Sequence, residues 1–263
     1  MSITTVGSQL IHYEVLGRGQ PLIFIHGWLG SWRYWWPSMQ AMSSGCRSFA
    51  FDLWGFGDSS KSADKYTLDA YVTMIDQFIE QLGIFTPVTL IGHSLGAAAA
   101  LRYAIEHPDK VDRLAAVALP FQGSLINSRL TDSDPDSFIT KIVGKSNSYS
   151  EVDSELRKTD QLALNSSALE LTTYDFAADL ATCTRPTLMI SGDQDVVVQS
   201  PSSEEFQQNS SGDGRAYVTL EECNHFPMLQ EKAKFNRLLL DFLHTDESLA
   251  DLALKEHWHR RIR

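Results

Sequence analysis

Short apolar runs alternate along this chain with longer segments in which apolar residues recur every three or four positions. Several short runs, such as LIFI at 22–25 and TLMI at 187–190, are apolar almost without interruption. Runs of this kind are typical of strands covered on both faces, as in a mostly parallel sheet. The runs predict strands at 9–15, 22–26, 49–53, 88–91, 114–119, 187–191 and 216–220.

Three of the intervening segments have helical spacing. Thr67 is a suitable N-cap for a helix with an apolar stripe, and Gly83 ends it. Residues 95–106 are rich in alanine and stop before Pro108, and residues 228–243 repeat apolar side chains at helical intervals. Strand–helix alternation of this kind predicts an α/β fold, with a mostly parallel central sheet flanked by helices.

The alternation stops between about 120 and 179. This stretch is rich in Ser, Asp and Thr and offers only short helices, at about 136–143, 151–163 and 168–177. A structureless loop of that length is unusual in a compact domain, so we expect a functional insertion of small helices. The chain then divides into a core of residues 1–119 and 180–246, the insertion at 120–179, and a basic tail at 247–263.

Composition narrows the classes of partner and the compartment. A net charge of -11 argues against a nucleic-acid binder and against tight contact with an anionic membrane surface. No apolar stretch approaches the ~18 residues of a membrane span, and the first residues lack a secretory signal, so we expect a cytoplasmic protein. The basic tail is expected to be a solvated end, with peripheral lipid contact or partner binding as the alternative. Cys46, Cys183 and Cys223 are an odd number without a CxxC pair, which favours reduced, buried thiols.

The strongest chemical signal is GHSLG at 92–96. It follows a predicted strand and opens a predicted helix, so Ser94 would occupy a sharp strand-to-helix turn. Small neighbours let such a turn close, and the helix N-terminus favours a developing anion. We therefore predict that Ser94 is a nucleophile.

A serine hydroxyl is a weak nucleophile and requires a base and an orienting acid. In this topology both should follow later strands, the acid first. His225 follows the predicted strand at 216–220 and is the predicted base. Asp193 and Asp195 follow the strand at 187–191; we prefer Asp195, which lies further out on the loop, and leave Asp193 as the alternative.

An oxyanion requires two N–H donors. The N–H of Leu95, directly after the nucleophile, is one candidate. The second is the N–H of Trp28, because HGW at 26–28 ends an earlier predicted strand with a glycine turn. The aromatic cluster of Trp32, Tyr34, Trp35 and Trp36 either lines an acyl pocket or packs against the sheet, and packing is the commoner outcome.

Taken in order, five motifs resemble those of cap-bearing proteins of the α/β-hydrolase fold: HGW (26–28), DLWGFGDS (52–59), GHSLG (92–96), GDQD (192–195) and NHFPMLQ (224–230). That group includes esterases, lipases, C–C bond hydrolases, haloalkane dehalogenases and epoxide hydrolases. The resemblance spans about 9–243 and implies a helical cap at 120–179. It also implies a triad of Ser94, Asp195 and His225, with Trp28 and Leu95 as oxyanion donors and with no metal or cofactor. Asp52 and the glycines after it resemble a turn that is usually structural.

One departure narrows the activity. Dehalogenases and epoxide hydrolases of this group use an aspartate where this chain has Ser94, and serine is suited to attack on an acyl carbonyl. We therefore expect a serine esterase, of the carboxylic-ester-hydrolase class, acting on a small-molecule ester or acyl substrate. Two alternatives stay open: a C–C bond hydrolase, whose acidic substrate would be held by cations such as Arg129, Lys141 and Lys145, and a ligand sensor with slow turnover.

Overall fold

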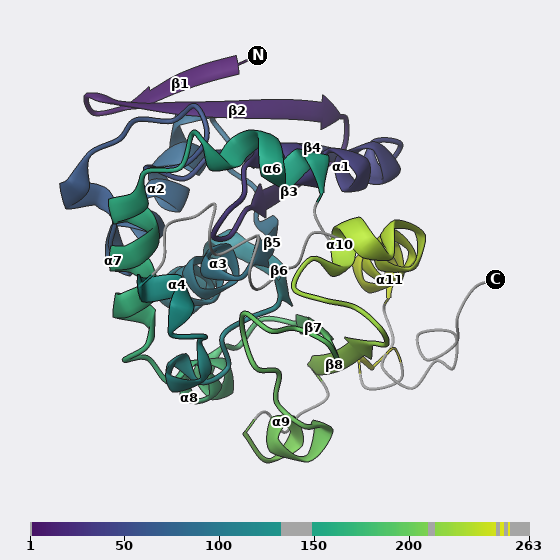
Figure 1. Ribbon diagram of the computed structural model, residues 1–263. Coiled ribbons are helices and arrows are strands. Elements are labelled where there is room, and N and C mark those ends of the chain that lie inside the picture. The colour runs from purple at the N-terminus through teal and green to yellow at the C-terminus, as the bar shows by residue number, and fades with distance from the viewer. Residues whose placement is uncertain (1, 133–148, 210–213, 246–247, 250–251, 253–263) are drawn as a thin grey trace.

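The computed structural model describes residues 2–132, 149–209, 214–245, 248–249 and 252. Its centre is an eight-stranded sheet (Figure 1). In sheet order the strands are β1 (Ser2–Val6), β2 (Gln9–Gly17), β4 (Cys46–Phe51), β3 (Gln20–Ile25), β5 (Val88–His93), β6 (Val111–Val117), β7 (Thr187–Gly192) and β8 (Arg215–Leu220). β2 pairs antiparallel with β1 and with β4, and all other neighbours are parallel. The predicted fold, a mostly parallel sheet flanked by helices, is confirmed.

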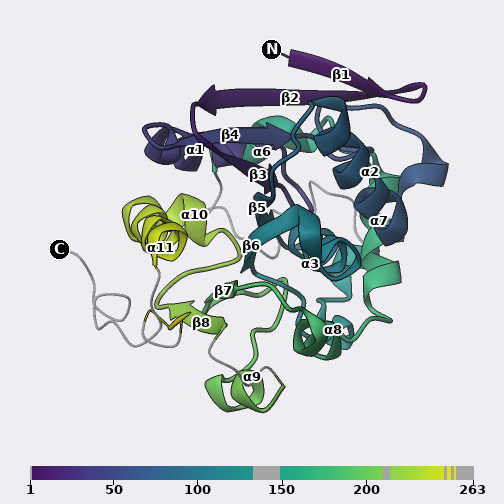
Figure 2. The same cartoon turned by 180° about the vertical axis from the view of Figure 1, so that it is seen from behind.

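Helices cover both faces of the sheet (Figure 1 and Figure 2). The helices are α1 (Trp36–Met42), α2 (Leu68–Gln81), α3 (Leu95–Glu106), α4 (Arg129–Asp132), α6 (Ser150–Leu156), α7 (Gln161–Leu171), α8 (Phe176–Thr182), α9 (Ser203–Asn209), α10 (Pro227–Gln230) and α11 (Lys232–His244). Short 3-10 turns are η1 (Trp32–Trp35), η2 (Ala63–Lys65), η3 (Pro108–Lys110) and η4 (Gly123–Leu125). α1 packs with α11 on one face, and α2, α3 and α8 form a row on the other.

The sequence pattern explains most of these elements. The apolar run of β3 is buried on both faces, as expected for an inner parallel strand. Thr67 caps α2 by accepting the N–H of Ala70, and α3 has the predicted bounds. The seven predicted strands correspond to β2 through β8, with ends shifted by a few residues. β1 was not predicted, because it is an edge strand with no fully buried position and so lacks an apolar signature.

Two predicted helices have the wrong bounds, and in each case an aspartate starts a new helix instead. The helix expected at 151–163 is two helices, α6 and α7, because the Asp160 carboxylate accepts the N–H of Leu162 and begins α7. The helix expected at 168–177 is wrong in the same way, since Asp175 caps α8 through the N–H groups of Ala177 and Ala178.

The helix predicted at 228–243 is also divided. Glu231, at φ -116 and ψ 53, separates α10 from α11. The helix expected at 136–143 and most of the basic tail at 247–263 lie outside the described residues. Among the residues that the structure describes, no helix combines the length and the apolar character needed to cross a bilayer.

The described part of 120–179 contains α4, α6, α7 and α8. α6 lies in front of the sheet in Figure 1 and behind it in Figure 2, whereas α7 lies to the left of the strands in Figure 1 and to their right in Figure 2. Polar contacts attach α7 to the core: the Asp160 N–H donates to the Gly55 carbonyl at 2.7 Å, and the Tyr66 hydroxyl donates to the Asp160 carboxylate at 2.7 Å. The division into core and cap stays a prediction, and these contacts show how closely the inserted helices adjoin the turn after β4.

Candidate active site

Ser94 lies in the turn between β5 and α3. Its backbone has φ 55 and ψ -117, a conformation that is strained for any residue other than glycine. The Ser94 N–H donates to the Val117 carbonyl at 2.8 Å, which ties the turn to β6. The side chain has no exposed surface. Strain held in place by surrounding structure is common at functional residues.

Gly92 and Gly96 make this turn possible. A Cβ on Gly92 would lie 2.4 Å from the Gly96 carbonyl oxygen, and a Cβ on Gly96 would lie 2.4 Å from the His26 carbonyl oxygen. Both contacts are with backbone, which cannot move aside cheaply. The two motif glycines therefore let α3 start directly against β5 and β3, with Ser94 between them.

The structure brings Ser94, His225 and Asp195 together. His225 Nε2 lies 3.1 Å from the Ser94 Oγ, and His225 Nδ1 lies 2.8 Å from the Asp195 Oδ2. The other carboxylate oxygen of Asp195 accepts the N–H groups of Val197 at 2.8 Å and Val198 at 3.0 Å. Asp195 is thus fixed by its own loop and can orient the imidazole.

Asp193, the alternative acid, lies elsewhere. Its Oδ1 accepts the N–H of Cys223 at 3.2 Å and so supports the loop that carries His225. Gln194 adds a second link, since its N–H donates to the Cys223 carbonyl at 2.8 Å. The geometry therefore favours Asp195 as the partner of His225 and gives Asp193 a supporting place in the loop.

The predicted oxyanion donors belong to the loop after β3 and to the start of α3. The N–H of Leu95 is the first of its helix and has no intrahelical acceptor. The Trp28 residue is fully buried, and its indole N–H donates to the Ser167 hydroxyl of α7 at 3.0 Å. Neither backbone N–H has a hydrogen-bond partner among the described residues, so both are available to an acceptor.

The side chain of His26 fixes the peptide between Gly27 and Trp28 through a hydrogen bond. The His26 Nε2 accepts the Leu53 N–H at 2.9 Å, which leaves the proton on Nδ1, and Nδ1–H donates to the Gly27 carbonyl at 2.8 Å. Burial lowers the pKa of His26, with the charge of Asp52 partly opposing it, so the ring is neutral near pH 7. Because the peptide is planar, fixing the Gly27 carbonyl also fixes the direction of the Trp28 N–H.

The aromatic cluster divides in two. Tyr34 and Trp35 have no exposed surface and pack in the core, with the Trp35 ring 5.2 Å from that of Phe24. Trp32 and Trp36 are partly exposed and line a surface hollow. Packing accounts for Trp35, whereas the hydroxyl of Tyr34 reaches the site: it accepts the Gly27 N–H at 2.6 Å.

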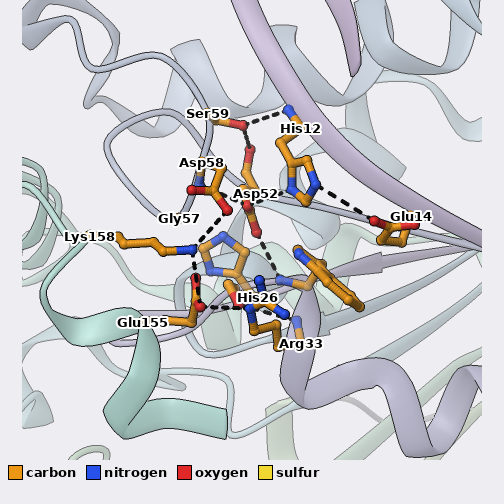
Figure 3. Close-up of polar contacts among 12 residues, drawn as sticks. His12, Glu14, His26, Arg33, Asp52, Gly57, Asp58, Ser59, Glu155 and Lys158 are labelled. Atoms are coloured by element: carbon orange, nitrogen blue, oxygen red, sulfur yellow. Dashed lines mark hydrogen bonds and ion pairs between the residues drawn. The ribbon is translucent and has the colours of Figure 1, made fainter. Parts of the chain in front are cut away.

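Another polar cluster surrounds Asp52, in the turn after β4 (Figure 3). One ligand atom from each of His12, Asp52 and Asp58 lies within 4.8 Å of the others, a spacing that suits a metal ion. However, Asp52 Oδ2 accepts the Asp58 N–H and Asp52 Oδ1 accepts the Trp32 N–H, while Lys158 neutralises Asp58 at 2.9 Å. We therefore assign this cluster to holding the turn.

Two buried groups next to the site, His26 and His93, were not predicted, and Tyr34 was expected only as a member of the aromatic cluster and not as a hydrogen-bonding group. The two histidines lie within the quoted motifs but gave no separate signal, because a pattern of letters does not show what a side chain contacts. Tyr34 is brought to the site only by the fold. Arg129, proposed as a cation for an acidic substrate, is exposed on α4, and Lys141 and Lys145 lie outside the described residues.

Comparisons with known proteins agree with this architecture. Residues 20–145 match the family described as alpha/beta hydrolase fold. A soluble epoxide hydrolase from Corynebacterium sp. is 34% identical over 104 residues, 40% of this chain and 36% of its own length. The chain therefore spans little more than a third of that relative. A pimeloyl-[acyl-carrier protein] methyl ester esterase from Nitrosomonas europaea is 26% identical over 253 residues, 86% of this chain and 96% of its own length.

Solved structures show the same fold. The enol-lactonase from Burkholderia xenovorans superposes with a TM-score of 0.79 at 18% identity, covering 93% of this chain and 100% of that one. The eight-stranded sheet, the strand-to-helix turn at Ser94 and the family match over residues 20–145 lead to one conclusion. The chain has the α/β-hydrolase fold, and its residues 20–145 match the family of that name.

Proposed function

We propose that this chain is a serine hydrolase that cleaves carboxylic esters through an acyl-enzyme on Ser94. The observation that carries the proposal is the pair of contacts made by His225, 3.1 Å to Ser94 Oγ and 2.8 Å to Asp195 Oδ2. With the Nδ1 proton held by Asp195, Nε2 has a free lone pair that faces the serine hydroxyl.

The reaction follows from these positions. Ser94 Oγ attacks the acyl carbon while His225 Nε2 takes the hydroxyl proton, and the carbonyl oxygen becomes an oxyanion. The N–H groups of Leu95 and Trp28 would hold that oxyanion. As the tetrahedral intermediate collapses, the alcohol leaves with the proton from His225. Water then repeats the sequence on the acyl-enzyme and releases the acid.

The choice of an ester rests on the nucleophile and on two likenesses. Serine forms an acyl-enzyme with an acyl carbonyl, whereas opening of an epoxide by this group depends on a carboxylate. The esterase and the lactonase named above both act, by their names, on esters of carboxylic acids. For C–C bond cleavage, the one described candidate cation, Arg129, is exposed and offers no support.

The test combines one substitution with one probe. Ser94→Ala should reduce turnover of p-nitrophenyl esters to background and should abolish labelling by a fluorophosphonate. Ser48→Ala is the matched control, because Ser48 is equally buried and its hydroxyl has no partner among the described residues. Activity across a series of acyl lengths would then define the substrate class.

The outcomes separate the candidate functions. Labelling at Ser94 with rapid turnover supports the esterase. Labelling without turnover would instead favour the ligand sensor. If Ser94→Ala kept appreciable turnover, the nucleophile would be another residue and the proposal would be wrong.

A further inference from the structure

A buried chain of hydrogen bonds links two loops of the candidate site. The Gly27 N–H donates to the Tyr34 hydroxyl at 2.6 Å, and that hydroxyl lies 2.9 Å from His93 Nδ1. On the other side of the ring, His93 Nε2 lies 2.8 Å from the carbonyl oxygen of His225. Tyr34 and His93 have no exposed surface, so water does not compete for these bonds.

In each of these hydrogen bonds, the chemistry of the two groups determines which one donates. A carbonyl oxygen only accepts, so His93 Nε2 carries the proton that faces His225. Burial lowers the pKa of His93 well below its ordinary value, and the nearby His225 charge acts in the same direction, so the ring is neutral. His93 Nδ1 is therefore an acceptor, and the Tyr34 hydroxyl donates to it while accepting from Gly27.

This series of hydrogen bonds ends in two loops that catalysis must align. Gly27 precedes Trp28, the proposed oxyanion donor, and the Gly27 carbonyl is already held by His26. His225 is the proposed base. The ring of His93 also packs against that of His225, with 4.6 Å between their centroids. A shift of either loop would strain bonds that reach the other.

We propose that Tyr34 and His93 are positioning residues, which hold the oxyanion loop at Gly27 and the loop of His225 in a fixed relation to each other. This inference rests on the proposed ester hydrolysis, since it assigns roles around the same Ser94. Neither side chain touches the substrate in this scheme, and each acts through the backbone that it binds.

Tyr34→Phe is the sharpest variant, because it removes one hydroxyl and leaves the ring in place. It should lower kcat about 10- to 100-fold with KM within about twofold, since misplacing an oxyanion donor weakens transition-state binding more than substrate binding. Tyr71→Phe is the matched control. It removes an equally buried hydroxyl, one that donates to the Trp54 carbonyl at 3.1 Å, and should leave kcat and KM unchanged.

A double-mutant cycle tests whether the two residues act as one unit. His93→Asn shortens the side chain and breaks its reach to the His225 carbonyl. If Tyr34 and His93 act as a unit, kcat in the double variant should be within about threefold of kcat in the less active single variant. Losses that multiply would mean that Tyr34 and His93 act separately, and the inference would be wrong.

Hydrogen exchange gives a readout that does not depend on turnover. Tyr34→Phe should speed amide exchange at residues 27–29 and also at His225 and Phe226, whereas Tyr71→Phe should change neither. Unchanged exchange at His225 and Phe226 would overturn the positioning role of Tyr34 and His93 even if the protein hydrolyses esters. Conversely, the wild-type protein could show no turnover while Tyr34→Phe speeds exchange in both loops. That result would refute the proposed function and support the positioning role of Tyr34 and His93. If His93→Asn does not fold, the kcat and exchange results for Tyr34→Phe decide the question.

Discussion

At the scale of single residues, the clearest result is the different placement of Asp193 and Asp195. Only Asp195 reaches the imidazole, and Asp193 supports the His225 loop through the Cys223 N–H. We predict that Asp195→Asn lowers kcat by about 10³- to 10⁴-fold, because an amide can no longer hold His225 in the required tautomer. Steady-state kinetics on a p-nitrophenyl ester would measure it.

Asp193→Asn is the paired control for that experiment. It should lower kcat less than about tenfold and cost at most about 0.5–1.5 kcal/mol of unfolding free energy, the usual net value of one hydrogen bond, because the Asn amide oxygen can still accept the Cys223 N–H. If the two variants exchanged these effects, the acid would be Asp193 and the observed geometry would not represent the active arrangement.

The cysteines give a second prediction at this scale. Cys46, Cys183 and Cys223 are all buried, and burial raises the pKa of the Cys223 thiol to about 12. Since the thiolate is the reactive form, iodoacetamide at pH 8 should modify none of the three in the folded protein and should leave ester turnover intact. Mass spectrometry before and after unfolding in urea would show zero and then three adducts. Rapid native modification of Cys223, two positions before His225, would contradict this.

How far the site could be predicted depended on the kind of residue. Ser94, His225, Asp195, Leu95 and Trp28 lie in short motifs directly after strands, so the topology itself places them at one edge of the sheet. Their roles remain part of the proposal above.

The residues behind the site gave no such signal. His26, His93 and Tyr34 act through backbone groups far away in the chain, as where His93 meets the His225 carbonyl. Partners of that kind become visible only when the fold brings the loops together.

At the scale of elements, a buried carboxylate adds to the apolar contacts that attach α6 to the core. Glu155 is 2% exposed; its Oε1 accepts the Arg33 Nε–H at 2.6 Å and lies 3.4 Å from the Lys158 ammonium (Figure 3). Its Oε2 has no partner among the described residues. The charge of this carboxylate is therefore compensated by Arg33 and Lys158, both of which contact Oε1.

Arg33→Met should lower the unfolding free energy by about 1–3 kcal/mol, because it leaves a buried charge less well compensated. The value falls below that of a fully buried pair because the Arg33 side chain is 37% exposed and Lys158 stays. Adding Glu155→Gln should restore part of the loss. Arg237→Met, which breaks a pair on the surface of α11, should cost less than about 0.5 kcal/mol. Urea denaturation measures all four proteins, and equal losses for the two arginine variants would refute the buried pair.

Elements were predictable where packing imposes a period. α2 and α3 bury long apolar stripes, and their bounds agree with the prediction. For the short helices after residue 120, the predicted bounds were wrong. α6, α7 and α8 begin where an isolated aspartate or a local turn competes with weak helical periodicity. Boundaries of that kind are set by single hydrogen bonds, as at Asp160, and not by the apolar pattern.

At the scale of the whole molecule, the buried neutral histidines couple stability to pH. His26 and His93 both have a pKa lowered in the fold, chiefly by burial, whereas in the unfolded chain each regains a pKa of about 6.5. Below that pH the unfolded state binds more protons than the folded state, so stability falls as the pH decreases.

Between pH 6.5 and 5 we therefore expect the unfolding free energy to fall, with a slope that approaches about 1.4 kcal/mol per pH unit for His93, whose pKa is lowered well below its ordinary value, and a smaller slope for His26. Carboxyls with a lowered pKa, such as that of Asp76, add to the loss only at more acidic pH, through the unfolded range near 4. Urea midpoints across this range provide the measurement. His93→Asn should lower the slope by the contribution of one proton, about 1.4 kcal/mol per pH unit. A flat profile between pH 6.5 and 5 would mean that the two rings bind protons in the fold as readily as in the unfolded chain, and the acceptor roles assigned to His26 Nε2 and His93 Nδ1 would then be wrong.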